Sequence, residues 1–196
     1  MDSLIGIVGD GYVLLAADSA QGRSIVMMKG DEDKILNLDP FKMVAGAGDH
    51  GDKVQFTEYI QKNLALYNFR TGIPLSTKAA AHYTRGELAT ALRKNPYNVN
   101  MLFAGFDSDE GASLYFIDYL ASLHKMDFAC QGYAGHFLLG LLDKYYKKGM
   151  SLEEGLQLIQ LCVDQLKSRF IINAPSFVIK VVDKNGIRIL NKPTAV

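Results

Sequence analysis

The sequence contains no tryptophan, and it has only two cysteines and five prolines among its 196 residues. The cysteines, Cys130 and Cys162, are far apart and show no metal-ligand spacing, so we expect two buried thiols rather than a disulfide or a zinc site. No apolar run approaches the ~20 residues that a membrane span needs, and no basic segment followed by an apolar one marks a signal peptide. The sequence is therefore typical of a soluble intracellular protein that binds no membrane.

An excess of either charge is also missing. The chain has 21 lysines and arginines against 21 aspartates and glutamates, which gives no electrostatic reason to expect a nucleic-acid partner. Four histidines lack the spacing of metal ligands, so no metal or cofactor is predicted; they are His50, His82, His124 and His136. Apolar residues, in contrast, make up 48% of the chain, enough to form the core of one domain over residues 1–196.

Strand and helix patterns occur in blocks along the chain. Strands are expected over residues 4–8, 12–17, 24–28, 34–38, 42–47, 99–106, 112–119, 177–182 and 187–190. Helices are expected over residues 49–70, 76–94, 135–148 and from 151 onward, the last beginning with a Ser151–Glu154 capping box. Because the helices come in adjacent pairs, we predict an α+β fold, a four-layer αββα sandwich of two antiparallel sheets with a helix pair on each outer face.

Two patterns have both a functional and a structural interpretation. Residues 46–51 (GAGDHG) match the G-x-G-x-x-G pattern of dinucleotide-binding proteins, but a second helix follows where a parallel strand would be needed. A tight turn from strand to helix is therefore predicted there. Asp18 and Lys34 could relay protons at an active site, or they could form a buried ion pair between strands. The residue types alone favour the ion pair without excluding the relay.

Longer motifs carry a resemblance to a known family. The chain resembles the beta subunits of the proteasome core particle, which have the N-terminal-nucleophile hydrolase fold, at residues 16–19 (AADS), 33–35 (DKI), 40 (P), 45–48 (AGAG) and 51–52 (GD). Within that family it is similar to the non-catalytic eukaryotic subunit at the fourth position of the beta ring, at residues 54–63 (VQFTEYIQKN), 96–100 (PYNVN), 119–120 (YL) and 183–187 (DKNGI). The resemblance covers essentially the whole chain.

The resemblance implies how the site of an active member maps onto this sequence. In active members an N-terminal threonine attacks the peptide carbonyl, an aspartate and a lysine tune the proton transfer, and a glycine amide stabilises the oxyanion. By position, the aspartate corresponds to Asp18, the lysine to Lys34 and the oxyanion glycine to Gly48. The nucleophile corresponds to Asp2.

The nucleophile position departs from the active pattern. The carboxylate of Asp2 has no hydroxyl with which to attack, and we expect Met1 to be retained and to cover the amine of Asp2, with no propeptide before it. Ser3 offers a hydroxyl, but one residue along a strand its side chain is expected to face the other side. No catalytic residue is therefore predicted, and Asp2, Asp18, Lys34 and Gly48 are interpreted as the remnant of an ancestral site.

Two supporting positions depart from the active pattern as well. Where active members have a glycine-serine run, residues 132–135 read GYAG, so Tyr133 replaces a supporting hydroxyl. Where they have an Arg-Asp-x-x-Ser run, residues 169–173 read RFIIN, so Phe170 replaces a second aspartate. Both departures agree with a loss of catalysis.

The resemblance implies a structural role in ATP- and ubiquitin-dependent protein degradation. The chain would help to form the beta ring and position its active neighbours. It would assemble with other alpha and beta subunits in stacked seven-membered rings, with the help of assembly chaperones, in the cytoplasm and nucleus. The alternative is an independent amidohydrolase or threonine-type peptidase of the same fold, in which Ser3 or an unmasked N-terminus does the chemistry.

Overall fold

A computed structural model describes residues 2–23, 26–170 and 176–190 of the chain. The elements in chain order are β1 (Ser3–Gly9), β2 (Tyr12–Asp18), β3 (Gln21–Arg23), β4 (Val26–Lys29), β5 (Ile35–Asp39), β6 (Lys42–Gly48), α1 (His50–Thr71), α2 (Thr77–Leu92), β7 (Val99–Asp107), β8 (Gly111–Ile117), β9 (Leu123–Met126), β10 (Phe128–Gly132), α3 (Ala134–Tyr145), α4 (Leu152–Arg169), β11 (Phe177–Asp183) and β12 (Gly186–Leu190).

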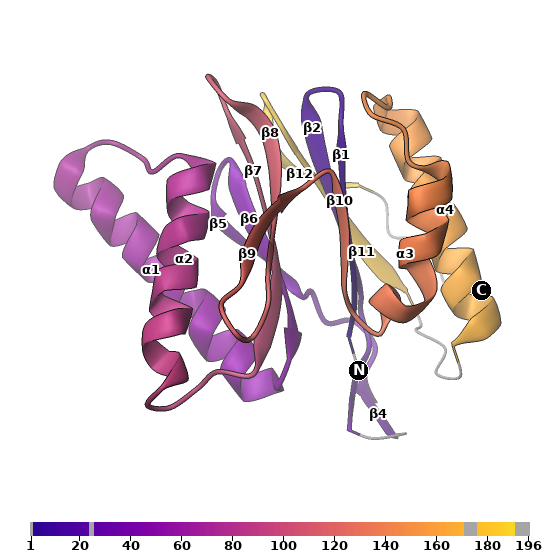
Figure 1. Ribbon diagram of the computed structural model, residues 1–196, viewed down its shortest axis with the longest axis horizontal. Helices are drawn as coiled ribbons and strands as arrows, with labels where there is room; N and C mark the ends of the chain where they lie inside the picture. Colours follow the sequence, from indigo (N-terminus) through magenta and orange to yellow (C-terminus); the bar gives the residue numbers. More distant parts are fainter. Residues whose placement is uncertain (1, 24–25, 171–175, 191–196) are drawn as a thin grey trace.

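These elements form four layers (Figure 1). One antiparallel sheet has the strand order β10-β1-β2-β11-β12, and the other has the order β5-β6-β7-β8-β9. Helices α3 and α4 pack on the outer face of the first sheet, and α1 and α2 pack on the outer face of the second. The prediction of an α+β fold, a four-layer αββα sandwich, is confirmed.

Apolar side chains fill all three spaces between the layers, and β2 shows how one strand serves two of them. Leu14 and Ala16 contribute to the core under α3 and α4, whereas Val13, Leu15 and Ala17 contribute to the core between the sheets. Every residue of β2 is buried. Because each fully buried leucine contributes about 1.5–3 kcal/mol, the two-sided burial of β2 holds the sandwich together.

Local signals in the sequence set several element boundaries. The predicted capping box is present, with the Ser151 hydroxyl accepting from the Glu154 amide and the Glu154 carboxylate accepting from the Ser151 amide. A hairpin turn at Asn185-Gly186 joins β11 and β12, and Gly186 has a φ of 91°, which favours glycine. Ser76 caps α2 by accepting from the amide of Ala79.

The end of the third helix was predicted wrongly. Instead of continuing to residue 148, α3 ends at Tyr145, and Tyr146 adopts extended dihedrals of −64° and 136°. The Tyr146 ring packs against Phe128 at a centroid distance of 5.0 Å, and its hydroxyl donates to the Val8 carbonyl at 3.0 Å. Because these contacts hold Tyr146 against the first sheet, the helix ends three residues before residue 148.

Three strands were not predicted. β9 and β10 complete the two sheets, and β3 pairs with β4 in a separate two-stranded ribbon. The strand expected over 112–119 ends at Ile117, because residues 119 and 120 form a turn instead. Of the strand expected over 24–28, residues 24 and 25 lie outside the described residues, and the rest belongs to β4.

Candidate functional site

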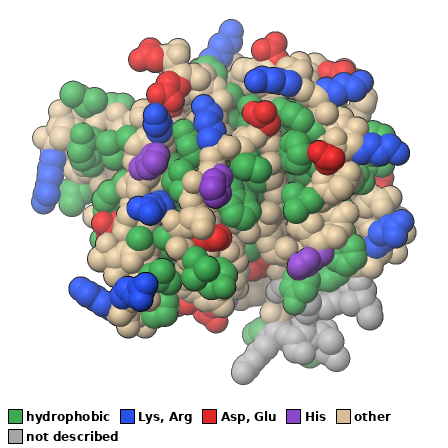
Figure 2. All heavy atoms as spheres, in the orientation of Figure 1, with side chains coloured by type: hydrophobic (Ala, Val, Ile, Leu, Met, Phe, Trp, Pro, Cys, Tyr) green, Lys and Arg blue, Asp and Glu red, His purple; other side chains and the backbone are tan. Residues whose placement is uncertain are grey.

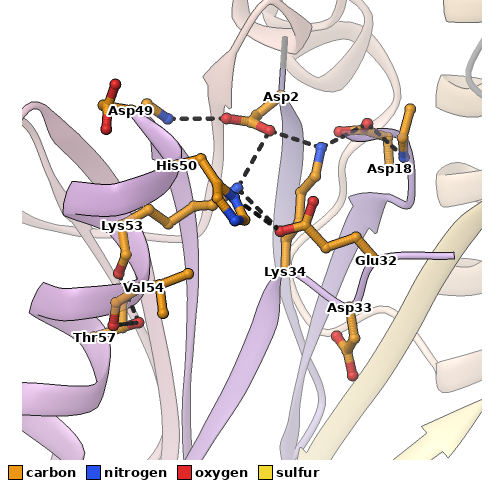
Figure 3. A network of polar contacts seen from close by, with 12 residues as sticks. Asp2, Asp18, Glu32, Asp33, Lys34, Asp49, His50, Lys53, Val54 and Thr57 are labelled. Carbon is orange, nitrogen blue, oxygen red and sulfur yellow. Dashed lines mark hydrogen bonds and ion pairs between the residues drawn. The ribbon is translucent and has the colours of Figure 1, made fainter. Parts of the chain in front are cut away.

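Asp2, Asp18 and Lys34, three of the four residues predicted to form a remnant site, meet at one end of the two sheets (Figure 3), and the amide of Gly48, the fourth, is hydrogen-bonded to Asp2. Asp2 directly precedes β1, and Asp18 is the last residue of the neighbouring strand β2. Lys34 directly precedes β5, and Gly48 is the last residue of β6. The site therefore joins two residues of the first sheet to two residues of the second.

Lys34 lies between the two aspartates. Its Nζ is 2.7 Å from Oδ1 of Asp2 and 2.8 Å from Oδ2 of Asp18, and its side chain is fully buried. Oδ1 of Asp18 also accepts from the backbone amide of Ser3 at 2.6 Å. The ion pair between Asp18 and Lys34, one of the two interpretations open from the sequence, is thus present and forms part of a triad.

The second oxygen of Asp2 is bound by the backbone. Oδ2 accepts from the Gly48 amide at 2.9 Å. Gly48 has a φ of 139°, and a Cβ there would lie 2.2 Å from the Asn98 carbonyl oxygen, so only glycine fits. The amide that the family resemblance assigns to the oxyanion is therefore hydrogen-bonded to the chain's own carboxylate.

The backbone of Asp2 is held as firmly as its side chain. Its carbonyl accepts from the Tyr133 amide at 2.9 Å, and Ser3 pairs with Gly132 in the sheet. A Cβ at Gly132 would lie 2.0 Å from the Asp2 carbonyl oxygen, so the two strands approach too closely for any side chain at this position. This close approach fixes the backbone of Asp2 and so limits the positions that its carboxylate can occupy.

Three further residues of the cluster were not predicted from the sequence. Lys53 is buried on α1, and its Nζ lies 3.6 Å from Oδ1 of Asp2 and 3.6 Å from Oε1 of Glu32. Nδ1 of His50 lies 3.4 Å from the same Glu32 oxygen. The glycine pattern held a signal for Lys53, since a Cβ at Gly46 would lie 2.8 Å from its Cγ. Gly46 leaves room for the lysine stem.

The same glycine pattern forms the predicted turn from strand to helix. β6 ends at Gly48, and Asp49 caps α1 by accepting from the amides of Gly51 at 3.0 Å and Asp52 at 3.3 Å. The chain then enters α1 and α2 without an intervening strand. The predicted tight turn from strand to helix is therefore present.

A second unpredicted lysine positions the segment that carries Lys34. Lys180 belongs to β11 of the first sheet, yet its Nζ lies 2.7 Å from Oδ2 of Asp33 and donates to the Ile35 carbonyl at 2.5 Å. Oδ1 of Asp33 accepts from the Ile35 amide at 3.0 Å. Lys180 therefore ties the residues on both sides of Lys34 across the gap between the sheets.

Burial and the neighbouring charges shift the pKa values of Asp2, Asp18 and Lys34 in opposite directions. Burial would raise the pKa of Asp2, but the two nearby lysines and the Gly48 amide outweigh it and hold this pKa below its ordinary value of 3.8. At Asp18 burial prevails over the attraction of Lys34, so its pKa is raised. Burial would lower the pKa of Lys34, but Asp18 and Asp2 together raise it above 10.5. Asp2 and Lys34 are consequently both charged at neutral pH.

The two supporting positions that depart from the active pattern touch one another. The rings of Tyr133 and Phe170 are stacked, with centroids 5.3 Å apart and planes at 29°. Phe137 of α3 also packs against Phe170, at a centroid distance of 5.7 Å. Residue 173, the last position of the compared run, lies outside the described residues. The two positions thus form an aromatic stack.

In residues 2–23, 26–170 and 176–190, no group of three His, Cys, Asp or Glu side chains is arranged to hold a metal ion. No helix in this part of the chain is long and apolar enough to cross a membrane. Cys130 and Cys162 are both buried free thiols, as expected.

Comparisons with known proteins agree on one family. The family described as "Proteasome subunit" matches residues 2–182. Proteasome subunit beta type-2-B of Arabidopsis thaliana is 55% identical over 188 residues, which cover 96% of this chain and 94% of the relative. Proteasome subunit beta type-2 of Dictyostelium discoideum is 49% identical and covers 97% of each chain. Proteasome subunit beta type-4 of Saccharomyces cerevisiae is 40% identical and covers 96% of each.

Proposed function

Since the chain belongs to the proteasome subunit family, we propose that it is a beta subunit of the core particle that contributes structure and no catalytic nucleophile. One observation carries the proposal. At the position that corresponds to the nucleophile, the carboxylate of Asp2 is bound between the Lys34 ammonium and the Gly48 amide. The proposal concerns this chain within a protease complex, whose function is protein degradation.

The chemistry of Asp2 supports an inactive site. A nucleophilic hydroxyl must be activated by a neighbouring base, and an oxyanion donor must be free to receive the carbonyl oxygen in the transition state. Asp2 has no hydroxyl, and its Oδ2 accepts from the Gly48 amide. A peptide carbonyl approaching this end of the sheets would have to displace a charged, buried carboxylate before it could reach the donor.

The surroundings of Asp2 support the same conclusion. Tyr133 and Phe170 stand where, by the family resemblance, active members have a hydroxyl and a carboxylate, and their rings stack on one another. Lys53 adds a second cation to the Asp2 carboxylate. The cluster therefore has the character of a structural ion network.

The ion network has a structural task within the sandwich. Lys34 precedes a strand of the second sheet, whereas Asp2 and Asp18 flank strands of the first. Their ion pairs consequently cross the interior and fix the separation of the sheets at this end. Removing one partner of such a buried network leaves an uncompensated charge, which typically costs about 3–5 kcal/mol.

The place of the chain in the cell follows from the same proposal. We propose that residues 1–196 form one domain in stacked seven-membered rings with other alpha and beta subunits, assembled with chaperones in the cytoplasm and nucleus. Neither a nucleic-acid nor a membrane partner is part of the proposal. In its support, Figure 2 shows basic and acidic side chains interspersed over the visible face rather than separated by sign.

Covalent labelling tests the proposal. Core particle purified from its source is treated with an electrophile directed at N-terminal threonines, and every subunit is mapped by peptide mass spectrometry. We expect adducts on the active subunits of the same sample and none on residues 1–3 of this chain. An adduct on Ser3, or on an exposed amine of the first residues, would instead support the independent hydrolase.

A further inference from the structure

A hollow in the described surface lies away from the charge cluster, at the opposite end of the sheets. It has a volume of about 1060 Å³ and lies between the end of α1, the beginning of α2 and the β5–β6 and β7–β8 turns. β6 runs from this hollow, at Lys42, to the charge cluster, at Gly48. In Figure 1 the β7–β8 hairpin is at the top and the N-terminus is at the bottom. The hollow, called the distal groove below, is therefore separate from the site of Asp2.

The distal groove is apolar inside and aromatic at its edge. Leu64 and Ala80 are buried in its wall, and Phe106 is half-buried. Two further aromatic rings at its edge are exposed to solvent: Phe69 is 84% exposed and Phe41 is 40% exposed. Large aromatic side chains at such exposure typically mark a surface that another molecule covers.

Acidic side chains line the groove together with these rings. Asp39 is paired with Lys42 at 2.9 Å, and both oxygens of Asp107 accept from the Thr77 amide at the start of α2. These two carboxylates are therefore already engaged.

Two further carboxylates, Asp109 and Glu110, are exposed on the β7–β8 turn. Neither has an ion-pair partner among the described residues. Lys184 is the one lining cation, among those residues, that has no such partner either. Setting aside the pair of Asp39 with Lys42, the edge carries an excess of negative charge.

We propose that the distal groove binds a basic segment of another proteasome subunit, with an apolar side chain in the groove and a lysine or arginine against Asp109 and Glu110. Charge complementarity selects a cationic partner, and the aromatic rings at the edge can also receive a guanidinium or ammonium over their faces. A second copy of this chain would have to offer a matching basic segment of its own. The inference rests on the proposed function, because it takes the partner from the same assembly.

Photo-crosslinking inside the intact particle identifies the occupant. A photoreactive amino acid replaces Phe69 in the full chain, the particle is purified and irradiated, and the linked peptide is sequenced. The control carries the same group at Ile189 of β12, which is 64% exposed and outside the groove. We expect position 69 to link to one peptide of another subunit that contains a lysine or arginine, and position 189 not to link to that peptide. No link, a link to a second copy, or a peptide without basic residues would overturn the inference.

A charge-reversal series tests the acidic edge. Asp109→Lys combined with Glu110→Lys is compared with the neutral pair Asp109→Asn and Glu110→Gln, each competing with the unmodified chain for incorporation into the particle. Glu58→Lys on the exposed face of α1, outside the groove, is the control. We expect the reversed pair to lower incorporation at least about tenfold, the neutral pair to lower it less, and the control to stay within about twofold. Equal incorporation of all variants would overturn the inference while leaving the proposed function intact, whereas absence of the unmodified chain from the particle would overturn both.

Discussion

Asp2 and Asp18 share one cation: Nζ of Lys34 lies 2.7 Å from a carboxylate oxygen of the first and 2.8 Å from one of the second. The two carboxylates do not share it equally, because the pKa of Asp2 is lowered and that of Asp18 is raised. Lys53 and the Gly48 amide also stabilise the ionised carboxylate of Asp2. Lys34 thus binds both carboxylates at once.

Removal of the shared cation tests this arrangement. Lys34→Ala should leave two buried carboxylates without their common partner and should cost about 3–5 kcal/mol of folding free energy. We expect much lower incorporation into the core particle but unchanged peptidase rates per assembled particle, measured with one fluorogenic peptide for each activity. Normal incorporation with the selective loss of one activity would argue for a catalytic role of Lys34.

A milder change isolates the charge of Asp2. Asp2→Asn keeps the shape of the side chain and an oxygen that can accept from the Gly48 amide, but it removes the ion pairs with Lys34 and Lys53. We expect a loss of stability smaller than that of Lys34→Ala, because Asp18 still neutralises Lys34. The thermal unfolding midpoint of particles that carry each variant ranks the two. A larger loss for Asp2→Asn would contradict the shared-cation arrangement.

The raised pKa of Lys34 predicts a dependence on alkaline pH. Because this pKa lies above the ordinary 10.5 in the folded chain, the stability it contributes is fully present below pH 10.5 and is lost as the pH rises through the folded value. Thermal unfolding between pH 9 and 12, in steps of about half a unit, should therefore fall more steeply for the unmodified particle than for one with Lys34→Met. Parallel curves would show that Lys34 does not titrate in this way.

Two glycine-to-alanine variants compare a position where the backbone requires glycine with one where it does not. Gly48→Ala would place a Cβ 2.2 Å from the Asn98 carbonyl at a φ of 139°, so we expect the variant to be excluded from the particle. Gly86→Ala lies within α2 with nothing within 4 Å of the new Cβ, and it should stabilise the helix by about 0.5–1 kcal/mol. Incorporation and thermal unfolding measure both, and equal behaviour of the two would contradict the close approach at Gly48.

The isolated chain is expected to associate rather than remain a monomer. All four residues of β4 are exposed, with Val26 at 61% and Met28 at 69%, and Phe69 adds a ring at the edge of the distal groove. Such side chains drive association when no partner covers them. Sedimentation velocity at tens of micromolar should show ill-defined oligomers or poor solubility. A sharp monomer with its own peptidase activity would contradict the architectural role.

The sequence predicted the layers well because their strands either alternate cleanly or are apolar on both faces, as β2 is from Val13 to Ala17. β9 could not be predicted in the same way, because His124 and Lys125 are exposed and only its first residue is even half-buried. It becomes a strand through pairing with β8, and this pairing depends on tertiary structure.

Prediction of the candidate site from the sequence was limited for a different reason. Asp2, Asp18, Lys34 and Gly48 were found through family motifs, which mark positions but not distances. Lys53 and Lys180 were missed because a lysine in a helix or strand normally indicates a solvated face. Only the packing of α1 and β11 against the other elements shows that both are buried.

The order of strands in the first sheet has a consequence for synthesis on the ribosome. β1 and β2 emerge first and can pair with each other at once, but their outer edges pair with residues made much later, as Ile5 does with Cys130 and Ala16 with Ile179. A nascent chain therefore exposes the β1 edge until β10 has been made and the β2 edge until β11 has been made, and such long-range closure is slow. Protection of these edges during translation, rather than the stability of the finished sandwich, is where we expect this subunit to depend most on other proteins.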